Sequence, residues 1–179
     1  MIPPITDVKT LRIMARDNLE GGAVTSGYSA NLPAVLKMLN DALATEIVGS
    51  LRYRRHHFMA RGIDGKSTAA EFLIHANEQL AHADLIAGRI VQLGGEPDFA
   101  PNNLAARSHG EYVAGISLAD MIREDLVAER VAIDGYRDFI TYLGEKDPTT
   151  SDLLKGVMAV EEAHASRLSE LLPGMPQVS

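Results

Sequence analysis

Six side chains that can coordinate a metal ion lie on helix-like segments, at positions where apolar residues are expected. These are Glu46, Gln79, His82, Glu129, Glu161 and His164. Glu46 illustrates the pattern, because it follows Leu43 by three residues and Leu39 by seven and therefore shares their apolar face. Carboxylate oxygens mixed with imidazole nitrogens suit iron, manganese or zinc. The types and positions of these residues predict a two-metal site inside a bundle of helices.

The argument for metal rests on charge. Burying several carboxylates close together is very unfavourable without a compensating cation. The apolar helix faces that carry the candidate ligands contain no arginine or lysine near them that could supply this positive charge. A purely structural polar network is the alternative, but such networks usually pair acids with basic side chains. Each residue alone is weak evidence, so the prediction depends on all four segments contributing together.

Spacing within the segments adds detail. Glu161 and His164 are three residues apart, which places a carboxylate and an imidazole on one helix face. A di-metal bundle of this kind has such a Glu-x-x-His pair on two helices and a single glutamate on each of the other two. Glu46 and Glu129 supply the single glutamates, and Glu161 with His164 supplies one pair.

The second helical segment departs from that pattern. Gln79, rather than a glutamate, stands three residues before His82. An amide oxygen is neutral and binds metal more weakly than a carboxylate. Glu78 is adjacent, but its direction differs from that of Gln79 by about 100 degrees, so we interpret it as a solvated or cavity-facing residue and not as a ligand. We therefore expect one metal position to be weaker than the other.

Four long segments with helical periodicity would position these residues, whereas strand-like alternation is nearly absent. They cover about 32–61, 67–93, 117–143 and 149–172. Ser67 and Ser117 are expected caps, and Thr149, Thr150 or Ser151 is expected to cap the last helix. Short connections within the first and last pairs predict two antiparallel hairpins, joined by one long crossover of about 20 residues. We predict an all-α four-helix bundle over residues 32–173, with an N-terminal extension (1–31) and a C-terminal tail (174–179).

Composition narrows the classes of protein. The chain has 179 residues, a net charge of −7 and no cysteine, which indicates one globular domain without disulfides, thiolate zinc sites or iron–sulfur clusters. An acidic protein has no general attraction to nucleic acid phosphates. No apolar run is long enough to span a membrane, and the N-terminus lacks a secretory pattern. We therefore expect a cytoplasmic protein that is not bound to a membrane.

Further residues near the stripes have two interpretations each. Tyr53, two turns after Glu46, is expected to be an ordinary core tyrosine, although it could donate a hydrogen bond near the site. His75, seven residues before His82, is either a transit ligand for incoming metal or an ordinary histidine. A basic cluster is interpreted as a solvated or inter-subunit face, with phosphate or DNA contact as the alternative; it comprises Arg52, Arg54, Arg55, His56 and His57. Residues 8–19 are expected to form a short helix that packs against a neighbouring subunit.

Several stretches resemble bacterioferritins. Residues 39–46, leading to Tyr53, resemble their first helix, and residues 82–97 resemble their second helix and its exit. Residues 125–129 and 161–164 resemble the third and fourth helices. The resemblance covers about residues 33–172. It implies a ferritin-like protein that oxidises Fe(II) with O2 or H2O2 at a di-iron centre and stores the ferric product in a hollow homo-oligomer.

On this hypothesis Glu46 and Glu129 each hold one iron, Glu161 bridges, and the two histidines complete the positions. Leu80 stands where bacterioferritins carry their haem-binding methionine, so no haem is expected. Only 15 residues follow His164, which leaves no room for the short fifth helix of 24-subunit ferritins. The chain is therefore more similar to the Dps-like branch, and a 12-subunit shell is favoured over one of 24.

Two alternatives remain open. The first is a shell-forming protein that sequesters metal or shields DNA and whose centre is weakened by Gln79. The N-terminal segment is not a basic arm, so the sequence gives DNA binding no support. The second is another di-metal oxidoreductase, either a manganese catalase or a rubrerythrin-type peroxidase. The absence of a cysteine-ligated rubredoxin domain argues against the peroxidase.

Overall fold

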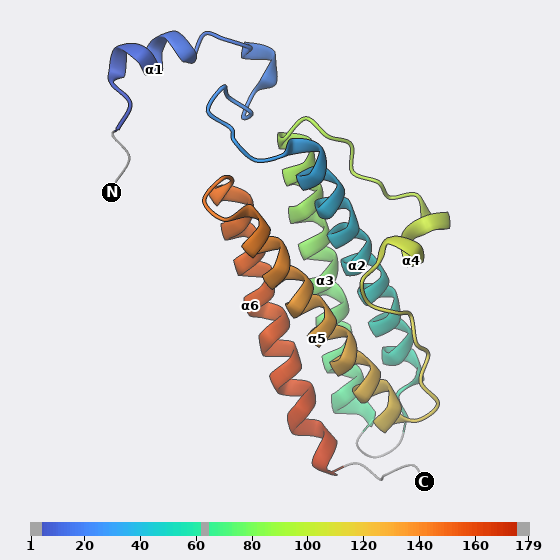
Figure 1. Cartoon of the computed structure of the whole chain (residues 1–179). Helices are drawn as coiled ribbons and strands as arrows, with labels where there is room; N and C mark the ends of the chain where they lie inside the picture. The colour runs from blue at the N-terminus through green and yellow to red at the C-terminus, as the bar shows by residue number, and fades with distance from the viewer. Residues whose placement is uncertain (1–4, 62–64, 175–179) are drawn as a thin grey trace.

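The computed structural model describes residues 5–61 and 65–174. Its four long helices are α2 (Leu32–Met59), α3 (Gly65–Gln92), α5 (Leu118–Leu143) and α6 (Pro148–Leu171). They pack side by side as two antiparallel hairpins, α2 with α3 and α5 with α6 (Figure 1). The described residues contain no strand. The predicted all-α four-helix bundle is confirmed.

The helix ends agree with the sequence in part. Ser117 caps α5 as predicted, because its side chain accepts a hydrogen bond from the Asp120 amide. α3, however, begins two residues before Ser67. α6 is capped by Asp147, not by one of the three residues after Pro148. Proline is favoured at the first position of a helix, where its missing N–H leaves no hydrogen bond unmade, so the cap falls on the residue before it.

Two apolar clusters fill the bundle. One contains Leu39, Leu43, Ile86, Ile90 and Leu154, and the other contains Tyr53, Phe72, Ile122 and Leu168. On each long helix the predicted ligands lie between residues of the first cluster and residues of the second. Full burial of a leucine or isoleucine stabilises a fold by about 1.5–3 kcal/mol. The polar centre is therefore held between two regions of apolar packing.

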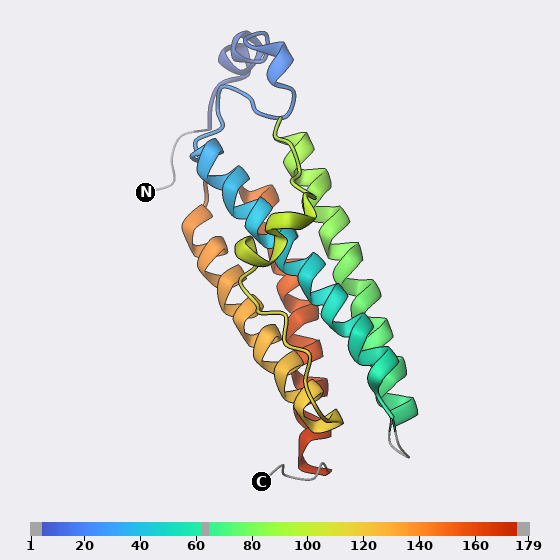
Figure 2. The same cartoon turned by 90° about the vertical axis from the view of Figure 1, so that its right-hand side faces the viewer.

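The crossover between α3 and α5 lies beside α2 (Figure 2). Within the crossover lie a 3-10 turn (η2, Pro101–Asn103) and the short helix α4 (Leu104–Arg107). Arg107 holds it in place by donating to the carbonyl oxygens of Asn40 and Asp98, each at 2.9 Å. These contacts fix the crossover against α2.

In the N-terminal extension, helix α1 (Val8–Met14) stands apart from the bundle in Figure 1, whereas Tyr28 donates a hydrogen bond to Asp147 at the start of α6. Helix α1 is shorter than the predicted 8–19 and is followed by a 3-10 turn, η1 (Leu19–Gly21). Val8, Leu11 and Ile13 are exposed, as the predicted packing against another subunit requires. Of the predicted C-terminal tail, residues 175–179 lie outside the described residues. Nowhere in the described part of the chain does a helix combine the length and apolarity needed to cross a membrane.

Candidate metal centre

The six predicted ligands converge in the middle of the bundle, although they come from four helices. All are buried, with exposed fractions of 0% for Glu46 and Glu161, 1% for Glu129, 4% for Gln79 and His164, and 6% for His82. The structure adds His75, which is also buried. The potential ligand atoms form two groups, each with its atoms within 4.8 Å of one another: Glu46, His82 and Glu161 in the first, and His75, Glu129 and His164 in the second.

The first group joins α2, α3 and α6. His82 Nδ1 lies 2.8 Å from a carboxylate oxygen of Glu161 and 3.3 Å from one of Glu46. The other oxygen of Glu46 accepts a hydrogen bond from the Tyr136 hydroxyl. Tyr136 was expected only as part of the apolar stripe of its helix. One imidazole nitrogen thus faces two carboxylates, one of which is held by a tyrosine.

The second group joins α3, α5 and α6. His164 Nδ1 lies 3.5 Å from an oxygen of Glu129 and 3.5 Å from one of Glu161. His164 Nε2 lies 2.6 Å from the Glu78 carboxylate, so Glu78, although half exposed, contacts a candidate ligand. When Nε2 donates its proton to Glu78, the lone pair of Nδ1 is directed at the cluster. A carboxylate that orients a ligating histidine in this way is common around metal ions in proteins.

Tyr53 and His75 also differ from the simplest expectation. The Tyr53 hydroxyl donates to Glu129, so its role extends beyond core packing. The ring of His75 stacks on that of His164, with centroids 3.8 Å apart and planes 18° apart. Its distance of seven residues from His82 was the only sequence signal for it. That signal could not distinguish a buried histidine facing the ligands from a solvated one.

Burial disfavours the ionised form of all three glutamates in the cluster. Burial, followed by the charge of Glu161, raises the pKa of Glu129. Burial also raises the pKa of Glu46, against the opposing effect of His82. For Glu161, burial acts in the same direction, but its polar neighbours Glu129, His164 and His82 outweigh it and lower the pKa. The glutamates therefore differ in how readily they ionise, and Glu161 is the one most readily ionised.

The three histidines of the cluster also differ in pKa. Burial disfavours protonation of His82 and His164, but neighbouring carboxylates outweigh burial and raise the pKa of His82 to about 9 and that of His164 to about 11. Burial, with the charge of His164, instead lowers the pKa of His75 to about 4. In the metal-free protein two imidazolium ions thus supply the charge that the carboxylates need. A metal ion must displace those protons, because a histidine ligates metal in its neutral form.

The predicted solvated or inter-subunit face is wrong for two members of the basic cluster on α2, whereas Arg54, Arg55 and His57 are partly exposed. Arg52 and His56 are buried and contact the two oxygens of Asp125, at 2.7 Å and 2.8 Å. Both have turned inward because Asp125, on α5, is itself fully buried and needs a partner. This arginine does not serve the candidate ligands. Within the described ranges, no arginine or lysine forms an ion pair with a glutamate of either group.

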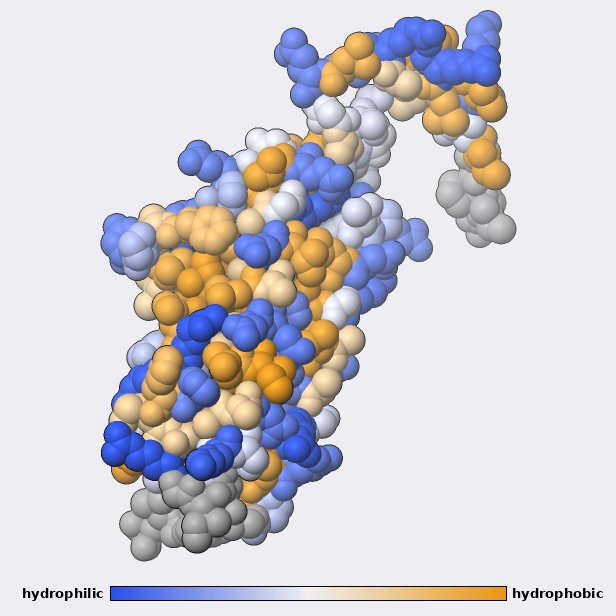
Figure 3. Space-filling model, turned by 180° about the vertical axis from the view of Figure 1, so that it is seen from behind, coloured by the Kyte–Doolittle hydropathy of each residue, from blue (hydrophilic) through white to orange (hydrophobic). Residues whose placement is uncertain are grey.

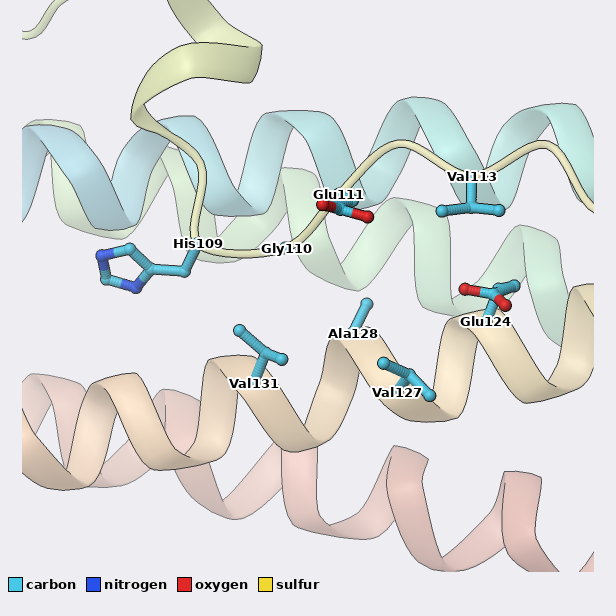
Figure 4. A pocket seen from close by; sticks show the side chains of 8 residues that line it. All are labelled: His109, Gly110, Glu111, Val113, Glu124, Val127, Ala128 and Val131. Carbon is cyan, nitrogen blue, oxygen red and sulfur yellow. The ribbon is translucent and has the colours of Figure 1, made fainter.

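A pocket of about 220 Å³ lies between the crossover and α5 (Figure 4). Its lining includes His109, Glu111, Glu124 and Val127, and none of the candidate ligands. His109 also lines a smaller cavity together with Tyr136, the tyrosine that holds Glu46. The pocket is thus separate from the two ligand groups. Its nearest link to them is His109, which shares the smaller cavity with Tyr136.

Comparison with known proteins agrees with this architecture. The model of the ferritin-like domain family matches residues 36–178, so the chain belongs to the ferritin-like family. Its relatives are bacterioferritins and Dps proteins. The bacterioferritin of Desulfovibrio desulfuricans is 28% identical over 131 residues, which cover 73% of this chain and 69% of that protein. The DNA protection during starvation protein of Pyrococcus furiosus is 28% identical over 147 residues, with 79% and 78% covered.

Two solved structures are similar over most of the chain. A dodecameric thioferritin, the bacterioferritin-related protein of Bacteroides fragilis, is 28% identical with a TM-score of 0.77, covering 80% of this chain and 87% of that one. A structure of Desulfovibrio desulfuricans bacterioferritin, described with its diiron site, is 26% identical with a TM-score of 0.70, covering 79% and 80%. The fold is therefore that of a ferritin-like bundle.

Proposed function

We propose that this protein is a ferroxidase that takes Fe(II) and O2 or H2O2 as substrates and stores or detoxifies iron in a hollow homo-oligomer. The observation that carries the proposal is the set of three buried glutamates without arginine or lysine partners. Glu46, Glu129 and Glu161 lie together with His82 and His164 in the bundle centre. In a ferritin-like fold, such a cluster is suited to hold two metal ions.

The residues fit the iron that the family implies. Buried polar atoms without partners normally mark an unmade interaction. Among the described residues, five buried side-chain atoms have no hydrogen-bond partner: Asp120 Oδ2, Glu161 Oε1, Glu129 Oε2 and the Nδ1 atoms of His75 and His164. All but Asp120 Oδ2 belong to the candidate ligands, and the last three belong to one group. Carboxylate oxygens combined with neutral imidazole nitrogens are a donor set that binds iron.

Each side chain has a role in this proposal. Glu46 and His82 would hold one metal ion, and Glu129 and His164 the other. Glu161 would bridge, since its carboxylate lies near both histidines, at 2.8 Å from His82 and 3.5 Å from His164.

Neighbouring groups would orient those ligands. Tyr136 and Tyr53 donate hydrogen bonds to Glu46 and Glu129 and limit the rotation of the two carboxylates. Glu78 accepts a hydrogen bond from His164 Nε2 and so directs the Nδ1 atom inward. When bound, the metal pair would supply two electrons to the oxidant, one from each Fe(II), with two protons added to convert O2 to H2O2 or H2O2 to water.

The exposed surface supports assembly into a homo-oligomer. Large apolar side chains on the outside of α3 are exposed, among them Ile74, Leu80, Leu85 and Val91. Figure 3 shows broad apolar areas on the rear face of the bundle. Exposed apolar patches of this kind mark interaction surfaces. Because the thioferritin relative is dodecameric, we favour a 12-subunit shell over one of 24. The cytoplasmic location stays a prediction.

The test is to mix metal-free protein with Fe(II) in air and follow the appearance of ferric absorbance. We expect oxidation faster than in a protein-free control, and slower oxidation when Glu161 is replaced by alanine. Glu162→Ala is the matched control, because Glu162 is adjacent but exposed. Oxidation no faster than without protein would remove the enzymatic part of the proposal.

One observation favours a second candidate, a metal-sequestering shell with a weakened centre. Gln79 donates its amide N–H to Glu161 at 2.9 Å and therefore presents a donor where a ligand was expected. A relative named for DNA protection belongs to the same family. This version predicts one strong metal position per subunit. It also predicts that Gln79→Glu sharply raises the rate of Fe(II) oxidation.

A further inference from the structure

Gln79 is oriented in a way that prevents it from ligating metal. Its Nε2 atom lies 2.9 Å from Glu161 Oε2, and its oxygen faces Gly49 of α2, where an added Cβ would come within 2.3 Å. The reversed amide would set two oxygens against each other at Glu161, so the hydrogen-bond network fixes the orientation. Gln79 thus contributes no ligand atom and also occupies an oxygen of Glu161.

His75 lies one turn before Gln79 on the same helix, and residues four apart share a helix face. It is 95% buried, since its exposed fraction is 5%. Its Nδ1 atom has no hydrogen-bond partner among the described residues. The same is true of Glu129 Oε2 and His164 Nδ1, and the ligand atoms of these three residues lie within 4.8 Å of one another.

Three unpartnered polar atoms in one buried place are costly. A buried donor or acceptor left without a partner loses the hydrogen bonds that it made to water in the unfolded chain. Two imidazole nitrogens and a carboxylate oxygen can all be satisfied by one cation. The two imidazole rings are stacked with their planes 18° apart, so one ring has to tilt for both in-plane lone pairs to reach the same ion.

We propose that His75 is a metal ligand, and that with Glu129 and His164 it forms the second metal position, in place of the carboxylate missing at Gln79. This inference rests on the proposed two-metal function and specifies it. The first position, with Glu46, Glu161 and His82, has two carboxylates and one imidazole. Apart from the bridging Glu161, the second has one carboxylate and two imidazoles, whereas the first has one of each. Imidazole suits Zn²⁺ and Fe²⁺, whereas oxygen ligands suit Mn²⁺, so the two positions differ in preference.

Titration of the metal-free, full-length protein with Zn²⁺ tests the inference without any redox activity. Calorimetry should show two Zn²⁺ per subunit for the wild type and one for His75→Ala, with affinity at the lost position lower by at least about 100-fold, beyond what outer partners contribute. His57→Ala is the matched control, because His57 is a histidine of α2 that contacts the Ala69 carbonyl and the Phe58 ring and lies in neither ligand group, and it should keep two. The double variant His75→Ala with Gln79→Glu should regain the second ion.

The outcomes separate this inference from the function on which it rests. Two Zn²⁺ in both wild type and His75→Ala would overturn the role of His75 and leave the two-metal site intact. One Zn²⁺ per subunit in both the wild type and His75→Ala would also overturn the role of His75, and would favour the second candidate function, a shell whose metal centre is weakened. No Zn²⁺ in the wild type would remove the metal site itself.

A second measurement does not depend on the variant folding. Anomalous scattering from wild-type crystals soaked in Zn²⁺ should place an ion within bonding distance of the His75 ring. An ion held by Glu129 and His164 alone, with His75 turned away, would overturn the inference.

Discussion

Asp125 and Asp147, towards the two ends of the bundle, are buried against arginines, whereas the three glutamates between them are not. Arg52 contacts Asp125 at 2.7 Å, and Arg89 contacts Asp147 at 2.9 Å. We call these two ion pairs the arginine-paired ends, and the cluster around Glu161 the arginine-free centre. At the ends each acid is neutralised within the chain. In the centre neutralisation depends on protons or on metal ions.

This difference shows that one bundle can use some buried acids for stability and others for metal binding. A buried acid paired with an arginine is already neutralised, and a metal ion cannot replace the arginine, which is part of the chain. A buried acid whose positive neighbours are histidines can exchange protons for a metal ion, because neutral imidazole is itself a ligand. Mutations at the ends should therefore change stability, and mutations in the centre should change metal binding. Four predictions test this separation.

The largest effect is expected for Arg52→Ala. Removing the arginine leaves Asp125 buried with only His56 as a charged partner, and breaking a buried pair in this way costs about 3–5 kcal/mol. Urea unfolding measures the loss in free energy of unfolding. Arg54→Ala is the control, since Arg54 contacts Asn77 at an exposed position, and it should cost less than about 0.5 kcal/mol. A loss of metal binding in the folded Arg52 variant would contradict the separation.

Glu161→Ala should weaken metal binding by at least about 100-fold, or 2.7 kcal/mol, because this carboxylate faces both histidines. Calorimetric titration with Mn²⁺ measures the affinity. The exposed neighbour Glu162, replaced by alanine, should keep the wild-type affinity. Affinity for Mn²⁺ unchanged in the Glu161 variant would mean that the centre is not a metal site.

Asp147→Ala should destabilise the protein by about 2 kcal/mol near neutral pH, through loss of the α6 cap and of the pair with Arg89. Burial opposes ionisation of Asp147, but hydrogen bonds from Thr150 and Tyr28 and the charge of Arg89 outweigh it and lower its pKa from 3.8.

The sign of the pH dependence follows from that direction. A carboxylate with a lowered pKa stabilises the fold above its unfolded pKa, and the contribution disappears as the pH falls through the folded value. The difference in unfolding free energy between wild type and Asp147→Ala should thus be full at neutral pH and shrink below about pH 3.8. The exposed Asp152, replaced by alanine, should show little difference at either pH. A constant difference across this range would argue against the ion pair.

Tyr136→Phe should have the smallest effect, a roughly tenfold loss of metal affinity, as expected when an outer hydrogen bond to a ligand is removed. The folded protein should lose only about 1 kcal/mol of stability. Tyr142→Phe serves as the control, because Tyr142 is on the same helix but half exposed. Equal Mn²⁺ affinity in the wild type and Tyr136→Phe would show that the hydroxyl does not position Glu46.

Much of the centre could be predicted from periodicity. Glu46, Glu129 and Glu161 share faces with leucines and isoleucines, and a helix face that is buried carries its polar members inward with it. The burial of Arg52 and His56 was not predicted, because a cluster of basic residues usually marks a solvated helix face. Only the position of Asp125 on a neighbouring helix turns them inward.

The sequence by itself determined the four helices, their pairing into hairpins and the level at which the predicted ligands meet, because all of these follow from local spacing and turn residues. Tertiary structure alone decided the partners. The contacts of Tyr53 and Tyr136 with the glutamates, the turn of Gln79 toward Glu161, and the approach of His75 to His164 each join different helices. Spacing along one helix fixes the direction of a side chain, but the distance to a side chain on another helix depends on how the helices pack.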